Sequence, residues 1–250
     1  VLEGGLTPNR IYLVEGHPGA GKTTLALQFL LEGVRNGEPA LYMTLSESAH
    51  ELEAVARSHG WSLDGITVRE YVLTTAAFDH EQVTMFHPSE VELGETLQRM
   101  LTDVDDFKPV RVVLDALSEL RLLAETPIRY RQQLLAFKQF FLTRRCTVLL
   151  LDDASGTLGD PHVQSVLHGV MVLERLRAAW GNERRQLRIT KLRGRFYRSG
   201  MHDYEIRRGG LEVFPRLGPA PSCGKAPQRA LPSGIPRLDE DAASRLTNRA

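Results

Sequence analysis

Residues 16–23 read Gly16-His17-Pro18-Gly19-Ala20-Gly21-Lys22-Thr23. This stretch fits the pattern G-x-x-x-x-G-K-[ST], with the β-rich run Ile11–Val14 before it and apolar residues at helical spacing after it as far as Gly37. A glycine-rich loop between a strand and a helix directs backbone N–H groups toward a phosphate, and the positive end of the helix adds to that anion site. The stretch therefore predicts a phosphate-binding loop. The alternative is a glycine-rich turn that arose by chance.

Two side chains of this loop have a chemistry of their own. Lys22 would place its ammonium on the β- and γ-phosphates, and Thr23 would offer its hydroxyl to Mg²⁺. His17 occupies a variable position of the pattern. The residues expected to bind the nucleotide are Gly16, His17, Pro18, Gly19, Ala20, Gly21, Lys22, Thr23 and Thr24.

Strand-like and helix-like segments alternate up to residue 151. We expect strands at 40–45, 66–72, 110–114 and 147–151, and helices at 48–59, 89–107 and 128–145. Strands that are apolar on both faces and alternate with helices predict a mainly parallel sheet flanked by helices. Further strands are expected at 166–173 and 186–192, with a hairpin at 204–214 that turns at Gly209-Gly210. The fold class is therefore α/β, with an antiparallel C-terminal extension of the central sheet.

Carboxylates at the ends of strands are candidates for the site, because in an open α/β sheet the ligand binds beyond the carboxyl ends of the strands. Asp115 follows the strand at 110–114 and would hold Mg²⁺, or else cap the next turn. Glu47 follows the second strand and would act as general base toward the attacking water, unless it is a solvated residue at a helix start. Asp152 and Asp153 end a further strand as outer groups of the site or as caps.

The 250 residues include 31 Lys plus Arg and 31 Asp plus Glu, so the formal net charge is zero. Residues 1–174 carry 14 basic and 24 acidic side chains, whereas the basic block at residues 175–208 carries 11 basic and 3 acidic ones. A net charge of zero argues against polyanion binding, but this block makes polyanion binding a candidate function again. No apolar run approaches the ~18–20 residues of a membrane span, no secretory signal opens the sequence, and two cysteines are too few for a disulfide framework. We expect a soluble, cytoplasmic protein with no membrane partner.

The C-terminal part differs from the rest in composition. Residues 218–236 hold five prolines and three glycines and predict a linker, and residues 237–250 are a polar tail. We therefore expect one domain at residues 1–217, followed by this linker and tail at residues 218–250.

The chain resembles the KaiC family, RecA-like P-loop NTPases that include circadian clock ATPases and kinases. The resemblance spans about residues 3–215 and rests on the phosphate loop, the strand that leads to Asp115 and five further stretches. These are Gly4-Gly5-Leu6, Thr44-Leu45-Ser46-Glu47, Ser58-His59-Gly60-Trp61, Met85-Phe86-His87-Pro88-Ser89-Glu90 and Lys191-Leu192-Arg193-Gly194. Residues 233–240 resemble the opening of a second such domain, so the chain looks like one N-terminal-type domain of a family in which two can stand in tandem.

The resemblance implies ATP hydrolysis with Mg²⁺ and a hexameric ring with ATP between neighbouring subunits, serving signalling or circadian-type timing with clock or signalling partners. In the family, the residues that match Lys191 and Arg193 reach the γ-phosphate of the adjacent subunit's ATP. Strand alternation puts both on one face, although a solvated edge strand with protective charges is the alternative. The family commonly has two adjacent glutamates where this chain has Ser46-Glu47, and its autokinase activity would belong to a second domain outside this chain.

Two other functions could use the same loop. A DNA-dependent ATPase, either a recombinase or a helicase-like motor, would bind DNA phosphates with the basic block. Its basic residues stand in or beside expected strands with few aromatic residues between them, so we expect no DNA partner. A P-loop kinase for a small metabolite lacks support because no lid-like, Arg-rich insertion separates the central helices. The acidic body and the basic block favour self-association instead, with the block of one subunit meeting the nucleotide of the next.

Overall fold

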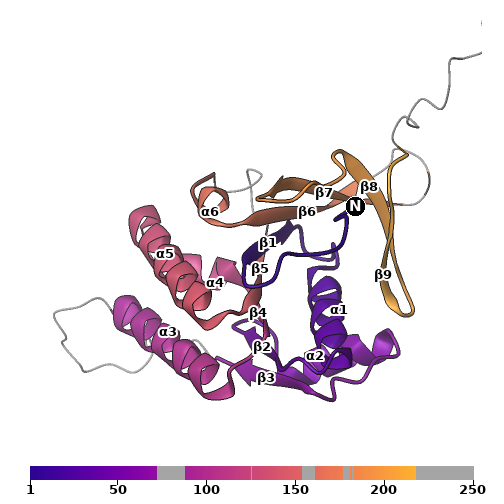
Figure 1. Cartoon of the computed structure of the whole chain (residues 1–250). Helices are drawn as coiled ribbons and strands as arrows, with labels where there is room; N and C mark the ends of the chain where they lie inside the picture. The colour runs from indigo at the N-terminus through magenta and orange to yellow at the C-terminus, as the bar shows by residue number, and fades with distance from the viewer. Residues whose placement is uncertain (72–87, 125, 154–160, 177–180, 182, 218–250) are drawn as a thin grey trace, which may run out of the picture. The chain divides into compact units, whose positions relative to one another are not determined.

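The computed structural model describes residues 1–71, 88–124, 126–153, 161–176, 181 and 183–217. Within them, nine strands form one sheet in the order β3-β2-β4-β5-β1-β6-β7-β8-β9 (Figure 1). The strands are β1 Ile11–Gly16, β2 Ala40–Thr44, β3 Ile66–Glu70, β4 Arg111–Asp115, β5 Thr147–Asp153, β6 Gly169–Leu176, β7 Arg184–Leu192, β8 Met201–Arg207 and β9 Gly210–Phe214. The helices are α1 Lys22–Arg35, α2 Ala49–Ser58, α3 Pro88–Phe107, α4 Leu117–Leu123, α5 Pro127–Arg144 and α6 Pro161–Val166.

The sheet is parallel from β3 to β6 and antiparallel from β6 to β9. This confirms the expected α/β fold with an antiparallel C-terminal extension. The parallel part follows from composition, because every residue of β1 and β2 is buried and such strands need a helical layer on both faces.

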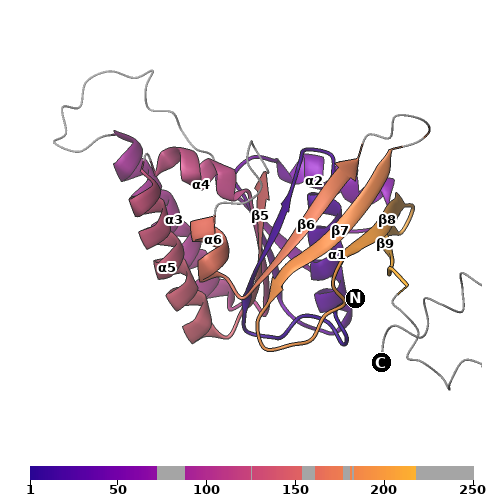
Figure 2. The same ribbon diagram turned by 90° about the horizontal axis from the view of Figure 1, so that it is seen from above.

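Helices α3 to α6 cover one face of the sheet, and α1 and α2 cover the other (Figure 2). Along β1, Ile11 and Leu13 join the core beneath α3 to α6, whereas Tyr12 and Val14 join the core beneath α1 and α2. The antiparallel strands curve around α1, so that β9 lies beside this helix (Figure 1). The C-terminal hairpin β8–β9 therefore reaches the helix that follows the phosphate loop.

One expected strand begins in the wrong place. Val166 ends α6, and β6 starts only at Gly169 and extends to Leu176. Val166 and Leu167 are apolar because they are buried in the core beside α5, and burial alone does not distinguish helix from strand. Gly169 suits the start of β6, since a Cβ there would lie 2.7 Å from the ring of Tyr12. Residues Leu117–Leu123, which follow β4 closely, form α4.

Several sequence features fall outside the described residues. These are the expected linker and tail at 218–250 and residues 85–87 of the KaiC-like stretch. Among the described helices, none is both long and apolar enough to span a membrane.

Candidate functional site

The phosphate loop connects the end of β1 at Gly16 to the start of α1 at Lys22. Gly21 precedes the helix with φ 95°, a left-handed conformation that residues with a Cβ rarely adopt. Gly16 is packed so closely that a Cβ would lie 2.7 Å from the carbonyl oxygen of Leu173 on β6. These two glycines allow a tight turn that leads directly into the start of α1, and a helix start that follows a glycine-rich turn suits an anion such as phosphate.

The Lys22 ammonium lies folded over this loop. Its Nζ is 2.6 Å from Oδ1 of Asp153, and it donates to the carbonyl oxygens of Gly16 at 2.8 Å and His17 at 3.3 Å. The strand register explains the ion pair, since Gly16 lies level with Asp153 at the carboxyl ends of β1 and β5. The ammonium of Lys22, which a phosphate would otherwise bind, is therefore paired with the carboxylate of Asp153.

Asp115 ends β4 at the same edge of the sheet. It lies level with Thr44 on β2 and Leu151 on β5, and it is buried. The hydroxyl of Tyr42 donates to Oδ2 of Asp115 at 2.5 Å. Burial raises the pKa of Asp115 against the opposing effects of the Tyr42 hydrogen bond and the Lys22 charge. The peptide bond from Asp115 to Ala116 is cis.

Glu47 stands on the turn between β2 and α2. Its N–H donates to Oγ1 of Thr44 at 2.9 Å, and the Thr44 hydroxyl donates back to the Glu47 carbonyl at 2.8 Å. Ser48 then opens α2 with a capping box completed by Glu51. The turn is thus fixed on both sides of Glu47, which holds its carboxylate toward the phosphate loop.

The surroundings of Glu47 disfavour the charged form of its carboxylate. Its Oε2 is buried without a hydrogen-bond partner among the described residues. Burial, followed by the charge of Asp115, raises the pKa of Glu47 to about 7. A carboxylate with a pKa near the working pH is well matched to proton abstraction.

This pKa carries a prediction for stability. Glu47→Gln should raise the melting temperature at pH 8 by roughly 2–4 °C, corresponding to ~1 kcal/mol once solvent screening is allowed for. Because the folded-state pKa is raised to about 7 from 4.5, folding loses free energy as pH rises between these values. The gain in the variant should therefore largely vanish at pH 5, where folded Glu47 is protonated. Thermal melts at the two pH values check it, and an equal gain at both would contradict the electrostatic origin.

These groups line one cavity of about 400 Å³. Its walls are Pro18, Gly19, Gly21, Lys22, Thr23, Thr24, Ser46, Glu47, Val55, Asp115, Ala116, Asp153 and Ile206. Of the loop residues expected to bind the nucleotide, Gly16, His17 and Ala20 do not line it, and Ala20 is fully buried. Neither Tyr42 nor Ile206 could be predicted as part of the site, because only the register of distant strands brings them to it.

Lys191 and Arg193 lie elsewhere. In β7, Leu192 pairs with Gly169 of β6, and Gly169 pairs with Tyr12 near the start of β1. The phosphate loop follows the other end of β1. Lys191 and Arg193, on either side of Leu192, therefore lie at the opposite end of the sheet from this loop. Arg193 follows the last residue of β7, yet both side chains donate to the carbonyl oxygen of Ser165 at the end of α6, at 3.1 and 3.0 Å. Within one chain they are therefore not part of the 400 Å³ cavity.

Lys191 and Arg193 belong to a cationic cluster with Lys138 on α5, whose Nζ donates to the carbonyl of Val166 at 2.6 Å. Burial and the charges of Lys138, Arg10 and Arg193 lower the pKa of the neighbouring His168 to about 4. Elsewhere in the basic block, ion pairs neutralise several arginines, among them Arg175–Glu183, Arg184–Asp203, Arg188–Glu174 and Arg207–Glu205. Lys191 and Arg193 bond to backbone carbonyls instead, and among the described carboxylates none forms an ion pair with either residue.

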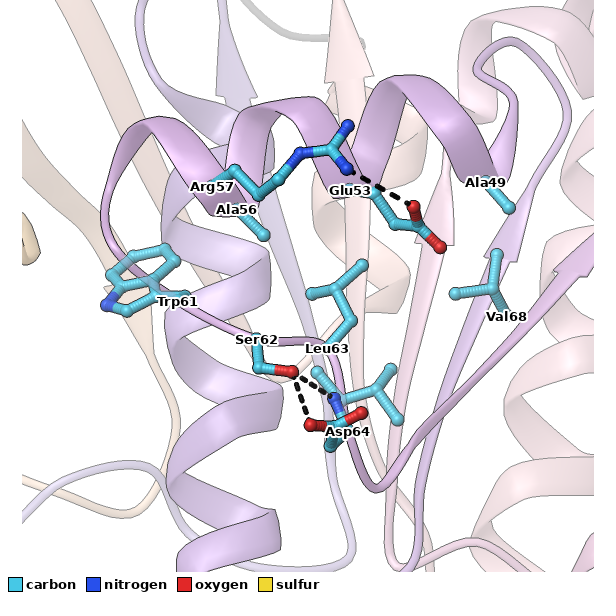
Figure 3. Close-up of a pocket in the computed structure, with 10 residues that line it drawn as sticks. Ala49, Glu53, Ala56, Arg57, Trp61, Ser62, Leu63, Asp64 and Val68 are labelled. Atoms are coloured by element: carbon cyan, nitrogen blue, oxygen red, sulfur yellow. Dashed lines mark hydrogen bonds and ion pairs between the residues drawn. The ribbon is translucent and has the colours of Figure 1, made fainter.

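A second cavity of about 490 Å³ lies between α2 and β3 (Figure 3). Each charged group that lines it has a partner in the cavity wall. Arg57 lies 3.9 Å from Glu53, and Ser62 donates to Asp64 at 2.6 Å. No buried, unpartnered polar atom is found on its ten lining residues, all of which are described. It offers no group suited to phosphate chemistry.

Comparison with known proteins is consistent with this geometry. Residues 1–218 match the model of the family described as the KaiC ATPase. The UPF0273 protein of Thermotoga maritima is 28% identical over 87% of this chain and 93% of its own length. The circadian clock oscillator protein KaiC of Parasynechococcus marenigrum is 25% identical over 96% of this chain, which spans 47% of that protein. The crystal structure of a KaiC-like protein from Pyrococcus horikoshii matches with a TM-score of 0.70 at 25% identity, over 85% of this chain and 93% of that one.

Proposed function

The chain belongs to the KaiC family of ATPases, and from this premise we propose that it binds Mg²⁺–ATP on the loop at residues 16–23 and hydrolyses it. The observation that carries the proposal is the 400 Å³ cavity in which Lys22, Asp115 and Glu47 meet. One group there suits each need of the reaction: a cation for the phosphates, a carboxylate for the metal ion and a carboxylate whose pKa is about 7 for the water.

The donor set at this edge of the sheet fits the proposed ligands. Thr23 and Asp115 offer oxygen atoms, which Mg²⁺ prefers. Among the described residues, no cluster of His, Cys, Asp and Glu could hold a metal ion alone, so phosphate oxygens would complete its coordination. Bound there, Mg²⁺ would neutralise charge that develops on the β- and γ-phosphate oxygens.

Lys22 would exchange one anionic partner for another when ATP binds. Its ammonium would leave Asp153 for the phosphates, while the loop N–H groups and the start of α1 hold the remaining phosphate oxygens. Glu47 would then accept a proton from the water that attacks the γ-phosphate. Among the described residues, its Oε2 has no hydrogen-bond partner that it would have to give up in doing so.

The remaining cations would come from a neighbouring subunit. Lys191 and Arg193 lie too far along the sheet to serve their own loop, and neither forms an ion pair with a described carboxylate. In a ring, the end of β7 in one subunit would face the cavity of the next, and its cations would stabilise charge developing in the transition state. A hexamer with ATP at each interface is the form that this proposal takes, with a role in signalling or timing. The many internal ion pairs of the basic block leave DNA binding with less support.

Subunit mixing tests the shared site. Arg193→Ala and Glu47→Gln subunits should each be nearly inactive in hydrolysis, yet a 1:1 mixture should recover about one quarter of wild-type activity, because one interface in four then pairs an intact Glu47 with an intact Arg193. Phosphate release by rings assembled with Mg²⁺–ATP measures this.

A matched control for this experiment is Arg195→Ala. Arg195 lies in the same segment and also donates to a backbone carbonyl, that of Gly5 at 2.9 Å. This variant should keep its activity and need no mixing. Mixtures of Arg193→Ala with Glu47→Gln that stay inactive while their rings assemble normally would contradict a role between subunits.

A further inference from the structure

The hairpin β8–β9 forms part of the wall of the phosphate site, although it lies about 180 residues further along the chain. The buried hydroxyl of Tyr204 on β8 donates to the carbonyl oxygen of Ala20 in the phosphate loop at 2.6 Å. Ile206 lines the 400 Å³ cavity, and its Cδ1 lies 2.5 Å from where a Cβ on Gly21 would be. A displacement of the loop by an incoming phosphate would therefore also move the residues of β8 that contact it.

His59 provides a third and polar connection between the same two parts. It follows the last residue of α2, and its ring lies between Thr24 on α1 and the hairpin. The Nε2 atom is 3.2 Å from Oγ1 of Thr24, and the Nδ1 atom is 3.0 Å from the carbonyl oxygen of Arg207. Thr24 directly follows Thr23, the proposed ligand of Mg²⁺.

The two partners determine which nitrogen carries the proton in the neutral ring. A carbonyl oxygen only accepts, so Nδ1–H donates to Arg207. Nε2 then accepts from the hydroxyl of Thr24. One imidazole thus forms an unbroken polar connection from the first turn of α1 to the last residue of β8.

The surroundings of His59 leave its ring little freedom. Its carbonyl oxygen accepts from the N–H of Gly209 at 3.0 Å, and its ring centroid lies 4.9 Å from that of Trp61. The Trp61 side chain, seen beyond the C-terminal end of α2 in Figure 3, also fills the space beside Gly210, where a Cβ would lie 2.5 Å from the indole. Packing alone would accept another aromatic side chain here, whereas the two hydrogen bonds need a group that both donates and accepts.

We propose that His59 is a positioning residue that couples nucleotide binding at the phosphate loop to the β8–β9 hairpin. Nucleotide that orders the start of α1 orders the hairpin through Thr24 and His59, and by reciprocity the hairpin holds the loop in its binding shape. The hairpin leads to residues 215–217, so the state of the site is passed toward the C-terminal side of the domain. The inference rests on the proposed nucleotide binding and adds a route by which that binding is transmitted.

The test combines amide hydrogen exchange of residues 201–214 with nucleotide affinity, measured on the full chain with Mg²⁺ and a non-hydrolysable ATP analogue. In the wild type, exchange in the hairpin should slow when the analogue is added. His59→Phe keeps a ring beside Trp61 but loses both hydrogen bonds. It should bind the analogue roughly three- to tenfold more weakly and lose the slowing of hairpin exchange even at saturation.

Two further variants separate coupling from simple loss of structure. His59→Gln can donate to the Arg207 carbonyl and accept from Thr24, so it should restore most of the affinity and the slowing. Thr24→Val, measured at saturation because Thr24 also lines the cavity, should lose the slowing of hairpin exchange as His59→Phe does, and combining the two should remove no more of it, since both break one connection. Thermal melts establish that each variant is folded.

The outcomes are distinguishable. If the wild type binds no nucleotide, the proposed function fails. If the wild type binds nucleotide but hairpin exchange does not change, or if saturated His59→Phe still slows hairpin exchange as the wild type does, the proposed function stands and the coupling role of His59 is overturned. Saturated Thr24→Val that still slows hairpin exchange as the wild type does would also overturn it.

Discussion

Glu47→Gln is expected to bind Mg²⁺–ATP as the wild type does and to hydrolyse it ~10²–10⁴-fold more slowly, the usual contribution of a general base. Glutamine has nearly the same shape and keeps the turn between β2 and α2, but it cannot take a proton from water. The pKa of Glu47, raised to about 7 by burial and the charge of Asp115, makes it the carboxylate best matched to this role. Phosphate release and nucleotide affinity, measured on the same preparation, separate the two effects.

Glu53→Gln is the matched control for this change. Glu53 lies on the exposed side of the neighbouring helix α2, paired with Arg57 at 3.9 Å and outside the 400 Å³ cavity. It should leave both affinity and turnover unchanged. Undiminished turnover in the Glu47 variant would remove Glu47 from the reaction and return it to the role of a residue that begins a helix.

Lys22→Ala is expected to weaken nucleotide binding roughly 100-fold or more, since it removes charge-assisted hydrogen bonds to the phosphates. In the structure the ammonium already lies on an anion, Asp153 at 2.6 Å, and on the loop carbonyls. A phosphate that enters the loop would therefore meet a cation poised for an anionic partner. Calorimetric titration with Mg²⁺–ADP and Mg²⁺–ATP measures the loss.

Arg35→Ala provides the comparison for this variant. Arg35 is an exposed cation at the other end of the same helix, and its partner is Glu32 at 3.3 Å. It should bind nucleotide as the wild type does. If Lys22→Ala, shown to be folded by thermal melting, keeps wild-type affinity, the phosphates do not bind at this loop.

Much of the fold and part of the site could be predicted because the signals are local. The loop pattern, the fully apolar strands and the carboxylates that end them are all readable from short stretches. Strand ends of a parallel sheet share one edge, so the convergence of Lys22, Glu47 and Asp115 follows from the fold class.

The features that sequence reasoning missed depend on register and distance. Tyr42 contacts Asp115 only because β2 and β4 pair with Thr44 level with Asp115, and no local pattern specifies that register. Ile206 reaches the loop only because the antiparallel strands curve around α1. His59 lies in the stretch 58–61 that resembles the KaiC family, but the hydrogen-bond partners of its ring lie 35 and 148 residues away along the chain.

The division into an acidic body and a basic block overstates the free positive charge of residues 175–208. Ion pairs such as Arg184 with Asp203 and Arg188 with Glu174 compensate much of the basic block, so the block is not a uniform cationic surface. Among the described residues, Lys191 and Arg193 at the end of β7 form no ion pair and bond to backbone carbonyls, but Arg185, Arg195, Arg198 and Arg208 form no ion pair either. Membership of the KaiC family, rather than the net charge of the block, therefore makes Lys191 and Arg193 the candidates for meeting a neighbour's phosphates.

We propose that the chain turns over ATP at the cavity where Lys22, Asp115 and Glu47 meet. The most direct test is phosphate release by the wild-type protein at saturating Mg²⁺–ATP, with the number of bound nucleotides per chain counted in parallel. We expect one nucleotide bound per chain and many phosphates released per site, and we expect Lys22→Ala to lose both. Stable binding of ATP with no more than one phosphate ever released per chain would contradict it.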